Sequence, residues 1–260
     1  MNLIVEKEYF SPAVVKLVVD APLIARSRRP GHFVIVRVGE RGERIPLTIA
    51  DADPQKGTIT LVVQAVGHST RLICSLEPGQ YLTDVVGPLG RATEIKKYGT
   101  VVCSGGGVGV APLLPIIKAM KQAGNKVISI LAARTADLII LEDEVLKHSD
   151  EVIVMTDDGS KGSKGLVTAG IADVLNREKV DLVVTIGPAI MMKFVALETQ
   201  KYNVPTMCSL NTIMVDGTGM CGACRVTVDG KTRFVCVDGP EFDAHKVDFD
   251  EMLTRLKAYN

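Results

Sequence analysis

The residues best suited to chemistry are three cysteines and an aspartate near the end of the chain. The segment MVDGTGMCGACRV holds two of these cysteines, and a third follows twelve positions after the second. Asp216, Cys221, Cys224 and Cys236 together have the spacing D-x4-C-x2-C-x11-C. Plant-type [2Fe–2S] sites use C-x4-C-x2-C followed by a distant Cys. The spacing therefore predicts a [2Fe–2S] site in which a carboxylate, a harder ligand than thiolate, replaces the first cysteine.

Three other interpretations of this segment stay open. A zinc ribbon usually carries two Cys-x-x-Cys pairs, and only one is present. A thioredoxin-like redox pair would start a helix after the first strand of its domain, and the flanking glycines disfavour that. Cys208, with twelve residues between it and Cys221, offers a fourth thiolate in place of Asp216. The cluster is favoured, because Gly217, Gly219 and Gly222 let the loop wrap closely and aim backbone N–H groups at the sulfurs.

A second candidate is the glycine cluster GGGVGVAP, which begins at Gly105 and ends at Pro112. It lies between an expected strand and an expected helix, where glycines allow a pyrophosphate to approach the helix N-terminus. Val110 stands where the dinucleotide fingerprint G-x-G-x-x-G has its third glycine, and no Gly-Lys-Ser/Thr of a P-loop follows. A tight strand-to-helix turn without a ligand is the alternative.

Two segments in the first hundred residues carry weaker signals. RIPLTIAD, from Arg44 to Asp51, joins an Arg, a Pro and a Thr at the start of a strand-like stretch, and an exposed Arg beside a strand would look the same. VGHSTRL, from Val66 to Leu72, is a small-residue turn with several donors for a phosphate. The four histidines show no paired spacing and no G-x-S-x-G occurs, so hydrolase chemistry has no support.

The elements that must position these residues change in kind along the chain. Short β-branched runs separated by turn signals, such as VVKLVVD and TITLVVQAV, predict an antiparallel barrel or sandwich. From Tyr98 on, strands alternate with helical patterns, which predicts βαβ units and a mostly parallel sheet. Helices are expected at about 110–122, within 166–179 and at about 189–201, and a last one follows a capping Asp248. The expected domains are 1–98, 99–203 and 204–260.

Composition limits the function. The chain has 260 residues, 47% of them apolar, and its thirty basic and thirty acidic residues cancel, so nothing draws it to nucleic acid. The longest apolar run, Val101 to Ile117, is too short and too broken by Gly and Pro to span a membrane. No secretory signal is expected, and six cysteines in such a chain favour thiols or metal ligands over disulfides. A cytoplasmic protein is therefore expected.

The order of barrel, nucleotide-binding domain and C-terminal cysteine segment resembles the ferredoxin-reductase-like flavoproteins. The most similar groups are the small subunits of NAD-dependent ferredoxin:NADP oxidoreductase, also called sulfide dehydrogenase, and the electron-transfer subunits of NAD-dependent dihydroorotate dehydrogenase. The resemblance covers essentially the whole chain. An Asp as first cluster ligand is a feature of the first group, and this supports Asp216 over Cys208.

The resemblance implies a set of flavin-binding residues. Pro46, Leu47 and Thr48 match the segment that lines the flavin, with Thr48 near its reactive nitrogen as the expected catalytic residue. Ile45 stands where the family has the arginine that binds the flavin pyrophosphate. The nearest arginine is Arg44, one position earlier, and Arg71 is a candidate to share this role. The second flavin-phosphate turn is matched by Gly67, Ser69 and Thr70.

The resemblance also implies nucleotide-binding residues. The pyrophosphate loop is matched by Gly105, Gly106, Gly107 and Gly109. Gly187 and Pro188 match the nicotinamide-side motif C-G-P, with Ile186 in place of its Cys. A loop near the nucleotide contains Asp157. The strand end LAARTAD offers both Arg134, which suits NADP, and Asp137, which suits NAD; the family favours NAD(H), and NADP(H) stays an alternative.

The function implied is that of an electron-transfer oxidoreductase subunit. A hydride would pass between NAD(P)H and FAD, and single electrons would pass through the [2Fe–2S] cluster to or from a larger flavin and iron–sulfur catalytic subunit, with ferredoxin reached through that partner. No nucleic acid and no membrane is expected as a partner. The alternative within the family is the dihydroorotate dehydrogenase subunit, and the alternative of another class is a nucleotide-sensing module with a structural zinc.

Overall fold

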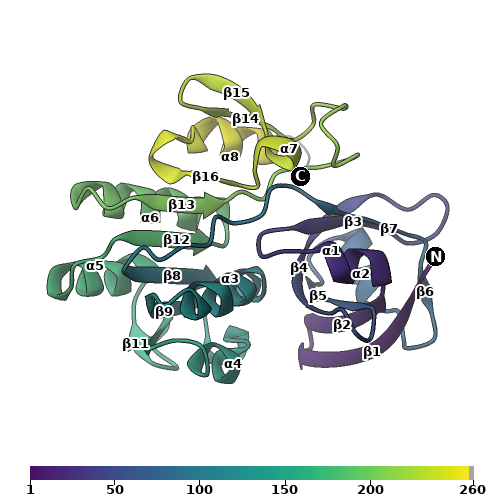
Figure 1. Cartoon of the computed structure of the whole chain (residues 1–260), viewed down its shortest axis with the longest axis horizontal. Helices are drawn as coiled ribbons and strands as arrows, with labels where there is room; N and C mark the ends of the chain where they lie inside the picture. Colours follow the sequence, from purple (N-terminus) through teal and green to yellow (C-terminus); the bar gives the residue numbers. More distant parts are fainter. Residues whose placement is uncertain (258–260) are drawn as a thin grey trace. The chain divides into compact units, whose positions relative to one another are not determined.

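The computed structural model describes residues 1–257, which divide into two compact units (Figure 1). The first unit contains Met1–Thr93, Thr212–Arg225 and Phe234–Pro240. The second contains Glu94–Asn211, Val226–Arg233 and the chain from Glu241 on. The loop with the predicted cluster ligands therefore packs with the N-terminal residues, although more than a hundred residues separate them in sequence. The domain boundaries expected above stay a prediction.

The first unit is built on a seven-stranded antiparallel sheet with the order β6-β1-β2-β5-β4-β3-β7. Its strands are β1 (Asn2–Ser11), β2 (Val14–Asp20), β3 (Phe33–Arg37), β4 (Ile45–Asp53), β5 (Thr58–Gln64), β6 (Tyr81–Leu82) and β7 (Asp84–Leu89). One residue, Thr83, separates β6 from β7, yet these strands form opposite edges of the sheet. The sheet must therefore curl until its edges approach, which makes a nearly closed barrel and confirms the predicted fold class.

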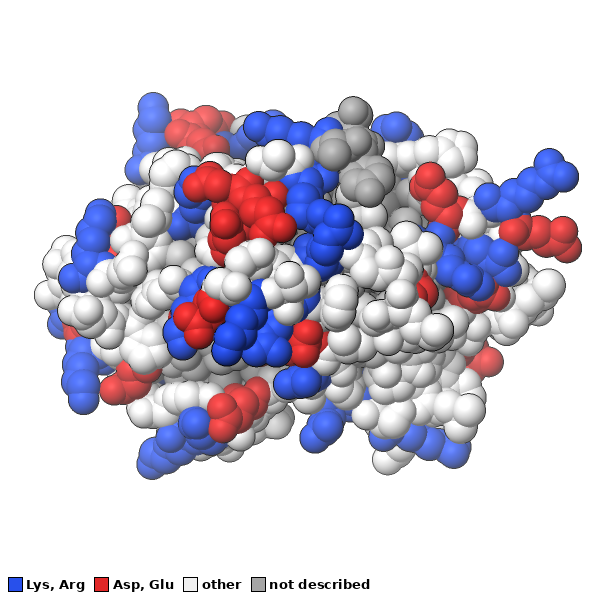
Figure 2. Space-filling view, turned by 90° about the horizontal axis from the view of Figure 1, so that it is seen from above, with Lys and Arg blue, Asp and Glu red and all other residues white. Residues whose placement is uncertain are grey.

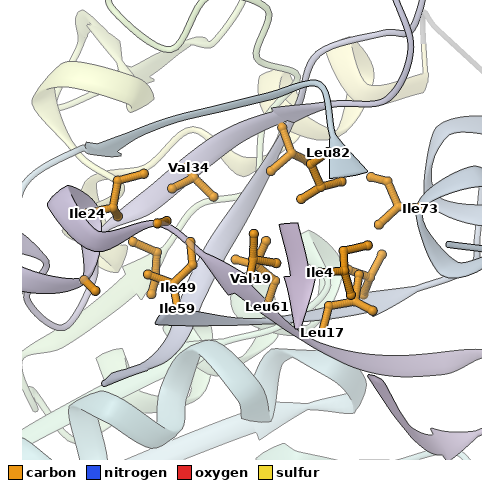
Figure 3. Packing of buried hydrophobic residues seen from close by; sticks show 14 of the residues in the cluster. Ile4, Leu17, Val19, Ile24, Val34, Ile49, Ile59, Leu61, Ile73 and Leu82 are labelled. Atoms are coloured by element: carbon orange, nitrogen blue, oxygen red, sulfur yellow. The ribbon is translucent and has the colours of Figure 1, made fainter. Parts of the chain in front are cut away.

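The barrel interior is filled by alternate side chains of its strands. On β2, Val15, Leu17 and Val19 face inward and are at most 1% exposed, while the residues between them are partly exposed. Figure 3 shows this core, in which Leu17 and Leu61 from the paired strands β2 and β5 lie among other buried apolar side chains. The alternation is the period of a strand with one buried face, so the sequence pattern and the barrel agree.

Three short helices accompany the barrel: α1 (Pro22–Ser27), α2 (His68–Cys74) and α7 (Val235–Asp238). The sequence predicted only a turn at Val66–Leu72, where α2 forms. The hydroxyl of Thr70 accepts the N–H groups of Val66 and Gly67, at 3.0 and 2.8 Å, and so caps the start of this helix. A seven-residue helix is too short to show a clear apolar periodicity, so its helical form depends on this capping.

His32 makes the stability of the first unit depend on pH. Its buried side chain accepts the N–H of Arg29 through Nδ1, at 3.1 Å. Burial lowers the pKa of the imidazole, and the charges of Arg29 and Arg28 lower it further. Because the unfolded chain binds the proton more readily, this contribution to stability is complete above about pH 6.5 and is lost as the pH falls below it.

Replacing His32 by glutamine removes this titration. We expect the urea midpoint of His32→Gln to fall less steeply than that of the wild type between about pH 7 and pH 5. Arg28, which is paired with Asp51 at 3.0 Å, stays charged in both proteins and leaves the comparison unaffected. Parallel curves for the two proteins would show that His32 is not the titrating group.

The second unit is a mostly parallel seven-stranded sheet with the order β11-β10-β9-β8-β12-β13-β16, as predicted. Only β16 runs antiparallel, against β13. The strands are β8 (Thr100–Gly106), β9 (Lys126–Ala133), β10 (Glu151–Thr156), β11 (Ser163–Lys164), β12 (Leu182–Ile186), β13 (Thr206–Ser209) and β16 (Glu241–Asp243). A separate pair consists of β14 (Arg225–Val228) and β15 (Lys231–Phe234).

The helices of the second unit confirm the predicted ones. They are α3 (Val110–Gln122), α4 (Glu142–Leu146), α5 (Val167–Arg177), α6 (Ala189–Lys201) and α8 (Phe249–Lys257), with short 3-10 turns η1 (Gly107–Gly109), η2 (Ala136–Leu138) and η3 (Ala244–Lys246). The predicted cap of the last helix is present: the Asp248 carboxylate accepts the N–H of Glu251 at 2.9 Å. Met252 on this helix is buried.

The strand order of the second unit reverses at β8. Strands β9 and β10 lie on one side of β8, and β12 and β13 lie on the other. In open parallel sheets, ligands bind outside the carboxyl ends of the strands at such a switch point. The glycine cluster follows β8 and Gly187 follows β12, so both predicted nucleotide motifs are at this edge.

No helix among residues 1–257 is long and apolar enough to cross a membrane. Acidic and basic side chains both occur over the face shown in Figure 2, in keeping with the balanced charge of the sequence.

Candidate functional site

Two of the predicted cluster ligands face each other inside the first unit. Cys224 ends the glycine-rich loop and Cys236 lies in α7, and their sulfur atoms are 3.2 Å apart. Both side chains are at most 2% exposed. Burial raises the pKa of Cys236 to about 12, and the hydrogen bond from the Cys224 thiol contributes. Two adjacent buried thiols are suited to a metal, whose charge stabilises the thiolate form that the protein alone disfavours.

The other two predicted ligands, Asp216 and Cys221, form a second and less buried pair on the same loop. The Asp216 carboxylate accepts the N–H of Cys221 and the N–H of Thr218, each at 2.8 Å. These backbone hydrogen bonds, first of all that of Thr218, lower the pKa of Asp216. Asp216 is therefore an ionised carboxylate held beside Cys221; Asp216 is half-buried and Cys221 is exposed.

Glycines hold this loop against the barrel. Gly217 has a φ of 75°, and a Cβ there would be 2.7 Å from Ile35 of β3 and 2.8 Å from Leu89 of β7. Gly219 has a φ of 87°, and a Cβ there would be 3.1 Å from Val237 of α7. Only residues without a side chain can follow this path, because both the left-handed backbone and the close contacts exclude a Cβ.

The arrangement fits a binuclear cluster better than a single ion. Within residues 1–257, no three His, Cys, Asp or Glu side chains are grouped as ligands of one metal ion. A [2Fe–2S] cluster takes four ligands, two on each iron, so it needs two pairs of side chains. Cys224 with Cys236 and Asp216 with Cys221 supply these two pairs on one loop and its neighbouring helix.

Cys208, the alternative fourth ligand, is in the second unit. It lies on β13 between β12 and β16, is fully buried, and directs its thiol at the carbonyl of Phe242, 3.6 Å away. Burial raises the pKa of this thiol well above its ordinary value. Its contacts are those of a cysteine inside a sheet.

The flavin-lining segment forms the start of β4. Pro46, Leu47 and Thr48 pair with Ile35, Val34 and Phe33 of β3.

Arg44 precedes β4, and its guanidinium contacts the Asp84 carboxylate at 3.3 Å. Ile45, which occupies the family's arginine position, packs against the barrel core instead. Neighbouring strand residues point to opposite faces, so an arginine displaced by one position is directed differently. Arg71 is exposed.

The predicted flavin-phosphate turn lies beside the loop that precedes β4. Gly67, Ser69 and Thr70 begin α2, and the Ser69 hydroxyl donates to the Glu43 carboxylate at 2.6 Å. This contact joins the loop before β4 to α2, so the structure brings the two predicted flavin segments together. Sequence reasoning missed Glu43, because no spacing marks an acidic residue in a surface loop.

The glycines after β8 have different neighbours. A Cβ on Gly105 would be 2.9 Å from Val110, and one on Gly109 would be 2.5 Å from the carbonyl oxygen of Ile186. These two glycines allow α3 and β12 to pack closely. Gly107 has a φ of 54° and no atom within 4 Å of its ideal Cβ, so it is the position that borders open space. This open edge precedes the 13-residue helix α3, whose N-terminus suits a pyrophosphate.

The remaining nucleotide candidates surround the same edge of the sheet. Ile186 pairs with Gly105, so Gly187 and Pro188 follow directly beside the glycine loop. Arg134 follows β9 and is exposed, and its carbonyl accepts the N–H of Asp158 at 3.3 Å.

The loops after β9 and β10 meet. Asp157 donates its N–H to the carbonyl of Ala133 at 3.1 Å. The Asp137 carboxylate is occupied by the hydroxyl of Thr135. Of the two residues considered for nucleotide choice, Asp137 is therefore held within its own turn.

Family models match the cluster segment and the nucleotide-binding region. Residues 211–248 match the iron–sulfur cluster binding domain of dihydroorotate dehydrogenase B, and residues 104–197 match the oxidoreductase NAD-binding domain. The first range includes all four predicted cluster ligands, and the second includes all the predicted nucleotide residues. The predicted iron–sulfur and nicotinamide cofactors are thereby confirmed at the level of the domains.

Relatives that align over most of this chain are described as proteins of the same kind. A Thermotoga maritima protein described as a dihydroorotate dehydrogenase B (NAD(+)) electron transfer subunit homolog is 49% identical over all of this chain and 92% of its own length. A Desulforamulus reducens dihydroorotate dehydrogenase B electron transfer subunit is 32% identical over 88% of this chain and 90% of its own.

Among solved structures, an NADH-dependent reduced ferredoxin-NADP oxidoreductase matches with a TM-score of 0.96 and 48% identity, over 100% of this chain and 94% of that one. An Amycolatopsis cytochrome P450 reductase matches with a TM-score of 0.65 and 19% identity, over 78% of this chain and 65% of that one, which shows a shared fold. The chain belongs to the family of dihydroorotate dehydrogenase B electron transfer subunits and their homologues, and it is an electron-transfer oxidoreductase subunit.

Proposed function

We propose that this chain is the small subunit of a ferredoxin:NADP oxidoreductase of the sulfide dehydrogenase type. Bound FAD exchanges a hydride with NAD(H) and single electrons with the [2Fe–2S] cluster, which connects to the larger subunit. The observation that carries the proposal is the loop in which an ionised Asp216 is held beside Cys221, next to the buried Cys224 and Cys236 pair. The near-complete match to the NADH-dependent oxidoreductase structure supports it.

The cluster ligands follow from the pairing of side chains. Cys224 and Cys236 hold one iron, because their sulfur atoms already lie together in a buried site. Asp216, which is half-buried, and Cys221, which is exposed, hold the other iron. A carboxylate ligand there keeps the spacing of the site and changes one donor from sulfur to oxygen.

The flavin is assigned to the first unit. Thr48, with Pro46 and Leu47, lines the ring system, and the turn that contains Gly67, Ser69 and Thr70 holds the phosphates. Arg44 or Arg71 supplies the positive charge that faces the flavin pyrophosphate. The hydrogen bond between Ser69 and Glu43 supports this assignment, because it places the phosphate turn beside the segment that leads into β4.

The nucleotide is assigned to the carboxyl ends of β8 and β12. Gly107 borders the open edge, and Gly105, Gly106 and Gly109 shape the loop around it. Arg134, Asp157, Gly187 and Pro188 complete the set. NAD(H) is the proposed substrate, and the description of the solved relative as NADH-dependent supports it.

The partner is a larger catalytic subunit that carries flavin and iron–sulfur groups, through which ferredoxin is reached. The relatives are themselves described as electron transfer subunits, which implies such a partner. A cytoplasmic location is part of the proposal, because the six cysteines, all within the described residues, form no disulfide.

Replacing Asp216 by alanine tests the ligand set. We expect Asp216→Ala to lose most of its iron, because the variant lacks one ligand and the two backbone hydrogen bonds that shape the loop. Asp216→Cys restores a thiolate ligand and should restore iron binding. Cys208→Ala is the matched control and should keep its cluster. An intact cluster in Asp216→Ala, together with cluster loss in Cys208→Ala, would reverse the assignment.

The proposal as a whole is tested by a visible spectrum of the purified chain with iron and sulfide analysis. We expect flavin bands, a reddish cluster shoulder and about two irons per chain. A colourless protein with one zinc would favour the nucleotide-sensing alternative, against which the match of residues 211–248 to an iron–sulfur domain already counts.

A second candidate is the electron-transfer subunit of dihydroorotate dehydrogenase, and the descriptions of several relatives favour it. The two candidates differ in the partner. The complex purified from cells should reduce ferredoxin or NADP(+) if the first holds, and should oxidise dihydroorotate with NAD(+) if the second holds.

A further inference from the structure

Arg44 shares a face of its strand with residues assigned to the flavin. Ile45 and Leu47 pack against the barrel core. Side chains alternate along a strand, so Pro46 and Thr48 lie on the opposite face of β4, away from this core. Arg44 directly precedes Ile45, and the same alternation directs it to the face of Pro46 and Thr48. An arginine at position 45 would instead be directed into the barrel.

One carboxylate holds the Arg44 side chain in place. Asp84, the first residue of β7, accepts hydrogen bonds through Oδ2 from the Arg44 guanidinium at 3.3 Å and from Nε of Arg37 at 2.6 Å. Arg37 and Asp84 are register partners on β3 and β7, and their side chains are 22% and 25% exposed. These hydrogen bonds, first of all that of Arg37, lower the pKa of Asp84. The ionised carboxylate thus keeps together two guanidinium groups that would otherwise repel each other.

The two arginines differ in what else they contact. Arg37 also donates from Nη1 to the carbonyl of Glu40 at 2.7 Å, so it fastens the loop between β3 and β4. Within residues 1–257, Asp84 is the only hydrogen-bond partner of the Arg44 guanidinium, and the Arg44 side chain is 48% exposed. A guanidinium carries five N–H donors in a rigid fork, so most donors of Arg44 stay available for an anion. Two guanidinium groups and one carboxylate leave one positive charge at this place.

We propose that Asp84 is a positioning residue for the flavin, because it holds the Arg44 guanidinium where the pyrophosphate of FAD binds. Arg44 then donates charge-assisted hydrogen bonds to the phosphate oxygens. A guanidinium that is already oriented loses less rotamer freedom on binding, and this increases the affinity. The inference rests on the proposed flavin assignment of the first unit. It selects Arg44 over the exposed Arg71, which forms no ion pair among residues 1–257.

Asp84→Asn tests the inference by the sign of its effect, because it keeps the shape of the side chain and removes its charge. If Asp84 contributed only charge, the variant would be more positive at this place and would bind the anionic FAD more tightly. Positioning predicts the opposite. We expect the dissociation constant of FAD to rise about fivefold, in the range for one side chain that must be immobilised on binding. The measurement is the fluorescence of FAD released when the flavin-loaded chain is diluted.

Glu8→Gln is the matched control. It removes a carboxylate of the same sheet from its ion pair with Lys16, 2.8 Å away, and should keep the wild-type dissociation constant. A wild-type chain that binds no FAD would overturn the proposed flavin site itself. Equal or tighter FAD binding in Asp84→Asn, with FAD bound normally by the wild type, would overturn only the positioning role.

Arg44→Lys is the second variant, at an exposed position that tolerates the change. Lysine keeps the positive charge and lacks the fork that contacts a carboxylate and a phosphate at the same time. We expect a similar loss of FAD affinity, and unchanged affinity would overturn the inference even if Asp84→Asn does not fold. Because Asp84 acts through Arg44, adding Asp84→Asn to Arg44→Lys should cause no further loss. A further fivefold loss in the double variant would show that Asp84 acts by another route.

Discussion

Replacing Cys236 by serine is expected to give a folded protein without its cluster. Cys236 is buried, its sulfur is 3.2 Å from that of Cys224, and it lies on α7 against the loop that carries the other ligands. A serine hydroxyl occupies nearly the same volume, so the fold of the first unit should persist. It is a much harder donor than a thiolate, and iron in a cluster of this type prefers sulfur.

The measurement is iron and acid-labile sulfide per chain, with the visible spectrum of the same sample. The wild type should hold about two irons, and Cys236→Ser should hold close to none while keeping its flavin bands. Cys74→Ser is the matched control in the same unit, because Cys74 is a half-buried cysteine outside the predicted ligand set, and its thiol donates to the carbonyl of Val63 at 3.7 Å. A full complement of iron in Cys236→Ser would remove this residue from the ligand set.

Gly109→Ala is expected to damage both the fold of the second unit and nucleotide binding. A Cβ there would be 2.5 Å from the Ile186 carbonyl oxygen and 3.0 Å from the Gly187 Cα. Both are backbone atoms at the end of a central strand, so the turn η1 must move away. We expect the free energy of unfolding to fall by about 3 kcal/mol, the upper part of the range for overpacked sites.

The affinity of Gly109→Ala for NAD(+) should also fall, by at least about tenfold. The reason is that the displaced turn carries Gly107, which borders open space. Thermal unfolding and calorimetric NAD(+) titration measure the two effects. Gly106→Ala is the informative comparison, because the nearest neighbours of its new Cβ are side-chain atoms, the sulfur and terminal methyl group of Met191 and the Cδ of Pro188, and not backbone atoms. Its defect should be smaller, and a second change, Met191→Ala, should relieve it. Wild-type stability and affinity in Gly109→Ala would contradict the close packing described here.

Regular elements with strong periodicity could be predicted from the sequence. The helix at 110–122 forms over the expected residues, and the strand-like run VVKLVVD forms a strand over the whole of its length, at 14–20. The short helix α2 was missed, because its start depends on the Thr70 side chain and not on an apolar pattern. Local propensity is a weak guide for elements of one or two turns.

The glycines after the first strand of the second unit have packing roles that the sequence did not predict. The sequence pointed to the glycines after β8, and the reason given was close approach of a pyrophosphate. The structure shows that Gly105 and Gly109 are required for packing against Val110 and Ile186. The contact between Gly109 and Ile186 joins residues far apart in sequence, so no single-sequence pattern reveals it.

The same limit applies to the cluster loop. Its ligand spacing is local and could be recognised, and the residues 211–248 that match an iron–sulfur domain include it. Its packing against Ile35 and Leu89 of the barrel joins the two ends of the chain and could not be predicted. The position of Asp216 was predicted from spacing. The hydrogen bonds that its carboxylate accepts from the N–H groups of Thr218 and Cys221 are known only from the structure.

The central claim is that electrons pass within this chain between NAD(H), a flavin and the cluster. An anaerobic titration of the purified chain, with flavin and cluster bound, by NADH tests it most directly, with absorption reporting the flavin and electron paramagnetic resonance reporting the cluster. We predict that the flavin bands bleach and that the signal of a reduced [2Fe–2S] cluster appears, whereas Cys236→Ser bleaches without that signal. A flavin that stays oxidised in excess NADH, or a cluster that stays oxidised beside a reduced flavin, would contradict the account.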